Sequence, residues 1–157
     1  MKISDVVCYD AILPDLQSST RDGVITELIK ALDGAGALGT ANADEIIKSV
    51  IKRENEASTG LGRGVAVPHI KHNGIKKVVA AVGRSVAGVS FASLDKQPVY
   101  SIILLISPID DPEKHLQAME SIFRHLQRDN FRKFLRQSQS AAAIADLVKE
   151  ADENPSL

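Results

Sequence analysis

One apolar run constrains the fold of this 157-residue chain more than any other feature. Residues 99–106 read VYSIILLI, the strongest strand pattern in the sequence. A strand that is apolar nearly throughout has no face to present to water, as in sheets that are covered on both sides. We therefore predict a central strand whose two faces are both covered by other elements.

Apolar residues at helical spacing predict helices on either side of this strand in the sequence. The first helix spans about 20–33, with caps at 18–20, and ends at Gly34 and Gly36. Asn42 caps a second helix, with Glu45 three residues on. Asp111 and Pro112 start a third helix, which runs to about 126. The remaining predictions are strands near 3–13, 65–67, 78–84 and 88–91, short helices near 131–135 and 141–149, and a polar tail from 150.

The bulk composition excludes several classes of protein. The net charge of −1 and an aromatic content of 4% argue against a nucleic-acid binder. Cys8 is the single cysteine, so no disulfide can form within the chain, which fits a reducing compartment. No stretch is long and apolar enough to span a bilayer, and residues 1–5 lack a signal-peptide pattern. We predict a single-domain cytoplasmic protein that reaches a membrane only through a partner.

Residues 58–69, STGLGRGVAVPH, form the most informative motif. Alternating glycines allow unusual backbone angles and close approach to a ligand. A short apolar strand and Pro68 then lead to His69. A neutral imidazole is a good nucleophile near physiological pH, and peptide N–H groups of a glycine loop can bind phosphoryl oxygens. The motif is neither a P-loop nor a dinucleotide fingerprint, and on spacing alone it also suits a tight turn, a strand and a capping histidine.

Four further side chains are candidates either for the same site or for ordinary structural and solvent-exposed roles. Arg53 either complements the end of the second helix or reaches the phosphate. His115 falls in the first turn of the third helix, facing the domain, where the positive end of the helix dipole disfavours its charged form; it also suits simple packing. His125 falls on roughly the opposite side of that helix, and we predict that it is solvated. His72 decorates a turn; no cysteine or acidic cluster joins His69 and His72, so we expect no metal and no cofactor.

The residues together resemble the fructose/mannitol-type enzyme IIA domains of the bacterial phosphoenolpyruvate-dependent phosphotransferase system. Arg53-Glu54 and the 58–69 motif look like their active-site signature. The resemblance covers about 16–150 and is strongest to the single-domain nitrogen-regulatory type, with the IIA units of sugar transporters as the other choice. Downstream matches follow in order at 88–91, Asp95, 98–99, Pro108 and 115–116.

The resemblance implies a compact α/β domain over 1–157, with a core at about 3–150 and a polar tail at 151–157. A mixed parallel and antiparallel sheet of about five strands carries helices on both faces. His69 is implied to accept a phosphoryl group from HPr or its nitrogen-branch paralogue, and to pass it to a IIB partner or signal by its phosphorylation state. An alternative is a regulatory binding module that keeps the fold without transfer. The implied site consists of His69, His115 and Arg53, with a phosphate loop of Thr59, Gly60, Gly62, Arg63 and Gly64.

Two positions depart from the family pattern. Arg63 stands where members usually have asparagine, and Ile70 stands where many have glycine. Arg63 adds positive charge to the loop, which could strengthen phosphate binding or slow release. Ile70 changes the backbone freedom directly after His69.

Overall fold

Strand β6 (Val99–Pro108) is the centre of the sheet in the computed structural model, which describes residues 1–157. All of β6 except Tyr100 is buried, so the prediction of a doubly covered strand is confirmed. On one side β6 pairs antiparallel with β5 (Val79–Val89), which pairs parallel with β1 (Val7–Leu13). On the other side it pairs parallel with two short strands in succession. These are β3 (Val65–Ala66) and β4 (His69–His72), and β2 (Gly60–Gly62) joins β3 in an antiparallel hairpin.

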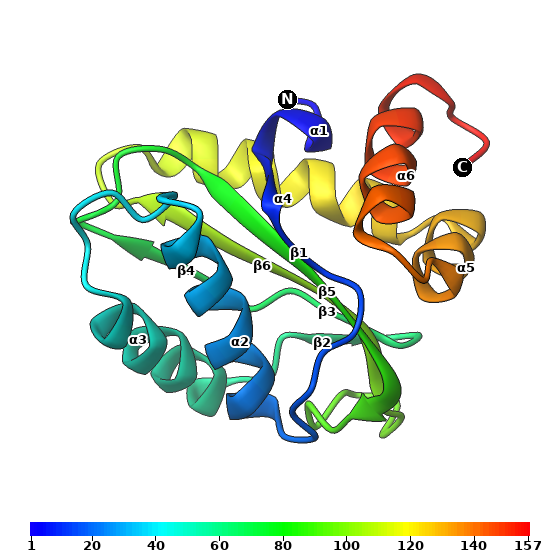
Figure 1. The fold of residues 1–157 in the computed structure, drawn as a ribbon, viewed down its shortest axis with the longest axis horizontal. Helices are drawn as coiled ribbons and strands as arrows, with labels where there is room; N and C mark the ends of the chain where they lie inside the picture. Colours follow the sequence, from blue (N-terminus) through cyan, green and yellow to red (C-terminus); the bar gives the residue numbers. More distant parts are fainter.

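The two faces of this six-stranded mixed sheet carry separate apolar cores. Successive strand residues point to opposite faces. Ile103 and Leu105 of β6 therefore belong to one core, whereas Ile102 and Leu104 belong to the other. Helices α2 and α3 cover one face, and α1, α4 and α6 gather on the other with α5 (Figure 1). The expected α/β class, with a mixed sheet covered on both faces, is confirmed.

Four of the six helices, α2, α3, α4 and α6, begin directly after a residue whose side chain caps the first turn. Their bounds are α1 Ile3–Val6, α2 Arg21–Gly34, α3 Ala43–Glu56, α4 Pro112–Leu126, α5 Asp129–Gln137 and α6 Ala141–Glu153. The predicted caps are confirmed: Thr20 accepts from the Gly23 N–H, Asn42 from the Glu45 N–H and Asp111 from the Lys114 N–H. These bonds satisfy amides that the first helical turn leaves free. None of the helices is both long and apolar enough to cross a membrane.

The sequence-based boundaries need correction at both ends and in the middle. Residues 3–13 open with a turn of helix before β1 begins. No separate strand forms at 88–91, since residues 88–89 are the end of β5 and residues 90–91 lie outside any strand. Helix α6 continues to Glu153, and Asp152 within it accepts hydrogen bonds from the Ile3 and Ser4 amides at 3.0 and 2.9 Å. The first residues of the expected polar tail therefore form the last turn of α6, where Asp152 binds the N-terminal segment. The tail itself begins after Glu153.

The prediction that His125 is solvated is wrong. His125 is 2% exposed, and its Nε2 lies 3.1 Å from Asp152 Oδ1. The buried stripe of α4 is broader at its last turn than its own apolar residues indicate, because Asp152 of α6 and Phe131 of α5 both meet the His125 ring there. Leu116, expected in the buried stripe, is instead 59% exposed beside His115.

Candidate functional site

Strand β4 sets the direction of His69. Its neighbour Ile70 is buried in the core beneath α2 and α3, so alternation sends His69 to the opposite face, where α4 lies. The first turn of α4 supplies His115, and the two ring centroids are 5.7 Å apart with the planes tilted by 42°. Two histidines that lie 46 positions apart in the sequence thus form one pair at the surface. Ile70 fills a core position, which gives the departure from glycine a packing role.

The His69 ring is held in one tautomer by the backbone. Its Nδ1 lies 2.8 Å from the carbonyl oxygen of Val67. A carbonyl can only accept, so in the neutral ring the proton is on Nδ1 and the lone pair is on Nε2. Burial lowers the pKa of His69 below its ordinary value, although the Val67 carbonyl opposes this shift; the nearby Arg53 charge lowers it further. His69 is therefore a neutral imidazole whose free nitrogen is Nε2.

His115 is also held neutral. Burial, followed by the neighbouring His69 and Lys71, lowers the pKa of His115 to about 4. The expectation from the helix dipole gave the right direction, but desolvation is the largest cause. Nδ1 of His115 lies 2.7 Å from the Ser107 hydroxyl oxygen at the end of β6. The pair therefore consists of two uncharged rings at neutral pH.

Arg53 lies half-buried at the end of α3. Its Nη1 donates to the Ala57 carbonyl at 2.8 Å, so the side chain folds over the C-terminus of the helix. This is the dipole-complementing position that the sequence allowed. The same side chain is close enough to affect the titration of His69. Both roles weighed for Arg53 are compatible with one conformation, since a guanidinium carries further N–H donors.

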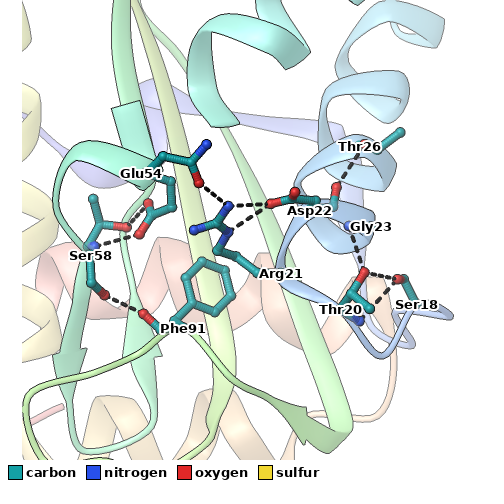
Figure 2. Close-up of polar contacts among 11 residues, drawn as sticks. Ser18, Thr20, Arg21, Asp22, Gly23, Thr26, Glu54, Ser58 and Phe91 are labelled. Atoms are coloured by element: carbon teal, nitrogen blue, oxygen red, sulfur yellow. Dashed lines mark hydrogen bonds and ion pairs between the residues drawn. The ribbon is translucent and has the colours of Figure 1, made fainter. Parts of the chain in front are cut away.

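Glu54 fastens the glycine loop to α3. It is 3% exposed, and its two carboxylate oxygens accept from the Thr59 amide at 2.7 Å and the Thr59 hydroxyl at 2.5 Å. Ser58 donates to the Phe91 carbonyl and accepts from the Gly60 amide. Figure 2 shows Glu54 and Ser58 in this network, beside Phe91 and the Arg21 side chain at the start of α2. The loop is thus held on both sides by buried hydrogen bonds.

The glycines shape a tight hairpin rather than an open cradle. Gly62 pairs with Val65 across β2 and β3, leaving Arg63 and Gly64 as the two turn residues, with φ of 57° and 80°. Two-residue hairpin turns with positive φ at both positions favour Asn-Gly. Arg63 therefore occupies the position where the family's asparagine would be less strained. Its amide donates to Asp95 Oδ2 at 2.9 Å, and this bond, together with that from Gln97, lowers the pKa of Asp95.

The structure brings together only part of the predicted site. His69 and His115 adjoin, and Arg53 lies close enough to influence His69. The Arg63 side chain faces α5, where its Nη1 is 4.0 Å from Asp129 Oδ1. Among the loop residues, the Thr59, Gly60 and Arg63 amides already bond within the chain. These amides build the hairpin and are not free for a phosphate.

Sequence reasoning assigned no role to two supporting residues, although Glu54 stood in the family signature. Glu54 continues the buried i, i+4 series of Ile46 and Val50 on α3. A carboxylate at a position that this spacing buries could have indicated a hydrogen-bonded structural role. Ser107 is fully buried at the end of β6, and no sequence pattern distinguished it from a turn residue.

His72 lies in β4, half-buried, and its Nδ1 accepts from the Gly74 amide at 2.9 Å. No three metal-ligating side chains cluster anywhere in the structure.

The fold is shared with solved structures of enzyme IIA proteins. The nitrogen regulatory protein IIA-Ntr from Neisseria meningitidis superposes with a TM-score of 0.84 at 25% identity, covering 93% of this chain and 98% of that chain. A "Nitrogen regulatory protein" of Pseudomonas aeruginosa is 34% identical over 148 residues, 94% of this chain and 95% of its own length. The "PTS system fructose-specific EIIABC component" of Bacillus subtilis is 32% identical over 152 residues, 97% of this chain. This chain spans only 24% of the length of that fructose protein.

The family follows from a model that matches nearly the whole chain. Residues 6–151 match the model described as "Phosphoenolpyruvate-dependent sugar phosphotransferase system, EIIA 2". The chain therefore belongs to the type 2 enzyme IIA family of this phosphotransferase system. The family resemblance drawn from the 58–69 motif is confirmed, and the relatives include both nitrogen regulatory proteins and fructose components.

Proposed function

We propose that this chain is a phosphohistidine carrier that accepts a phosphoryl group on Nε2 of His69. The observation that carries the proposal is the Val67 carbonyl, 2.8 Å from Nδ1, which leaves Nε2 with its lone pair. Family membership supports the reaction class. A nucleophile whose orientation is fixed by a second hydrogen bond is the general arrangement of covalent catalysis.

The transfer step balances without an external acid or base. The His69 Nε2 lone pair forms a bond to phosphorus as the bond from phosphorus to the donor's nitrogen breaks, and that electron pair returns to the donor. The proton stays on Nδ1, where it is hydrogen-bonded to the Val67 carbonyl, so the phosphorylated ring carries a positive charge. A positively charged ring is a better leaving group, which prepares the phosphoryl group for the next acceptor.

Arg53 and His115 are proposed to stabilise the arriving charge. The Arg53 guanidinium has N–H donors beyond the one bonded to Ala57, and it can meet phosphoryl oxygens as a fixed cation. His115 contributes a neutral ring 5.7 Å away, centre to centre. The hairpin at 59–64 keeps Thr59 and the strand leading to His69 in place, since the Val67 amide donates to the Thr59 carbonyl at 3.1 Å.

HPr or its nitrogen-branch paralogue is the proposed donor. A IIB partner, or a regulated protein that reads the phosphorylation state, is the proposed recipient. The decisive experiment is intact mass measurement after incubation with phosphoenolpyruvate, enzyme I and HPr or its paralogue. We expect one acid-labile phosphoryl group on the wild type and none on His69→Ala. Label on the His69→Ala variant would overturn the assignment of the acceptor.

The name carried by several relatives supports a second role, regulation by docking. A module that signals without transfer would take no phosphoryl group from any donor and would still act on its target when His69 is replaced by alanine. A carrier whose state is read would change its partner binding on phosphorylation. Comparing partner capture by phosphorylated and unphosphorylated wild type separates these two roles.

A further inference from the structure

The imidazole of His115 makes a single hydrogen bond, and it is to Ser107. The Nδ1 to Oγ distance is 2.7 Å. Nε2 lies on the opposite edge of the ring and bonds no protein group. Burial and neighbours keep this ring neutral, so one of its nitrogens carries a proton and the other does not.

Ser107 has no alternative partner. It is 0% exposed at the end of β6, where its backbone pairs with Lys71 of β4, two residues beyond His69. The His115 ring is the one group with which the Ser107 hydroxyl bonds. If Nδ1 carried the proton and donated to Oγ, the hydroxyl hydrogen of Ser107 would be buried without an acceptor, which is the costlier arrangement.

The lower-energy arrangement therefore has the Ser107 hydroxyl donating to Nδ1, with the His115 proton on Nε2. His69 has the reverse pattern, because its Nδ1–H is held by Val67 and its Nε2 is bare. Two rings 5.7 Å apart thus differ in role: one offers a lone pair and the other an N–H. Only the second is suited to donate to a phosphoryl oxygen.

We propose that Ser107 is a positioning residue that fixes His115 as an Nε2–H donor toward the phosphoryl group carried by His69. The proposal rests on the phosphocarrier function proposed above. Ser107 acts only through His115 and moves no proton during the transfer. Because Ser107 and His69 lie on adjacent paired strands, the sheet itself holds the donor ring at a set place relative to the nucleophile.

Nitrogen-15 NMR of the histidine side chains tests the tautomer directly. In the unphosphorylated wild type we expect His115 to show protonated Nε2 and bare Nδ1 at pH 7. Ser107→Ala should convert this single tautomer into a mixture, and Ser107→Thr, which keeps the hydroxyl, should restore it. Ser121→Ala is the matched control, since Ser121 is also buried, lies on the same helix as His115, and has an unpartnered hydroxyl. Assignment of the His115 signals uses His115→Gln.

Phosphoryl acceptance gives the second measurement. We expect Ser107→Ala to accept the phosphoryl group from phosphorylated HPr or its paralogue about tenfold more slowly than the wild type. This is smaller than the effect of losing an oriented donor outright, because the His115 ring is still present. Ser107→Thr should accept it at close to the wild-type rate. Protonated Nδ1 in the wild type, or an unchanged tautomer in Ser107→Ala, would overturn the proposal. A wild-type protein that takes no phosphoryl group would defeat the proposed function instead, while the NMR result would still decide what Ser107 does to the ring.

Discussion

Helix α4 carries one histidine in its first turn and another in its last, and the two have different surroundings. Burial lowers the pKa of both His115 and His125. His115 meets a neutral hydroxyl on one nitrogen and leaves the other free. His125 meets the carboxylate of Asp152, which also caps the amides of Ile3 and Ser4. Each ring leaves one nitrogen without a protein partner, and in His125 that nitrogen, Nδ1, is itself buried. Desolvation therefore does not distinguish the two histidines, whereas the bonded partner and the burial of the second nitrogen do.

The Asp152 carboxylate connects His125 to the N-terminal residues Ile3 and Ser4 through hydrogen bonds. His125, Asp152 and the first turn of the chain close α4, α6 and α1 together. At the other end of α4, His115 faces His69, the proposed nucleophile, with the exposed Leu116 beside it. We therefore expect substitutions at His115 to affect mainly phosphoryl transfer, and substitutions at His125 to affect mainly the free energy of unfolding.

The largest expected effect is on transfer, at His115. His115→Ala removes a donor and leaves the His69 nucleophile in place, so phosphoryl acceptance should slow by about a hundredfold. The rate is measured by quenched-flow labelling from phosphorylated HPr or its nitrogen-branch paralogue. The free energy of unfolding of His115→Ala should change by less than that of His125→Ala, at the other end of α4. A His115→Ala protein that transfers at the wild-type rate would remove His115 from the site.

The next effect is on stability, at His125. His125→Ala leaves Asp152 without one hydrogen bond and removes a buried ring that lies against Phe131, which should cost about 2–3 kcal/mol. Urea denaturation followed by circular dichroism measures this loss. Phosphoryl acceptance at low temperature, where the variant is folded, should stay near wild type. Asp152→Asn serves as the matched change on the partner, and similar losses from both are expected.

The pH dependence of stability sharpens the comparison further. Each of His69, His115 and His125 has a pKa below 6.5 in the folded state, so the unfolded chain binds protons first as the pH falls. The free energy of unfolding should therefore decrease as the pH drops below about 6.5. Denaturation at pH 7.5 and 5.5 checks this, and His115→Gln should flatten the dependence. Stability that rises toward pH 5.5 would contradict the neutral state of all three rings.

The smallest expected effect is at the hairpin turn, away from both ends of α4. Arg63 has a φ of 57°, in the left-handed region that asparagine tolerates better than arginine. Arg63→Asn should raise the free energy of unfolding by about 0.5–1 kcal/mol. Phosphoryl acceptance should be unchanged, because the Arg63 side chain faces Asp129 rather than His69. A large loss of acceptance would instead place Arg63 in the phosphate site.

The sequence by itself determined most of the long elements and the residue that we propose as the phosphoryl acceptor. The apolar run of β6 and the capping residues are local patterns, and the structure places them as predicted. Helical spacing located the helices but misplaced His125 and Leu116 on α4. The motif that ends at His69 led to the family, which the comparison confirms. These features follow from residues within a few positions of one another, where spacing fixes geometry.

Only the tertiary structure decided which side chains serve the site and which serve the core. His125 is buried because Phe131 of α5 and Asp152 of α6 meet it on a side of α4 that the helix's own apolar stripe leaves open. Ser107 meets His115 because β6 ends beside the first turn of α4, and Glu54 meets Thr59 because α3 runs into the loop. The tautomer of His69 depends on the carbonyl of Val67, which lies in the short link between β3 and β4. Hydrogen-bond partners of this kind depend on packing between elements, and a single sequence records residue types without recording which elements touch.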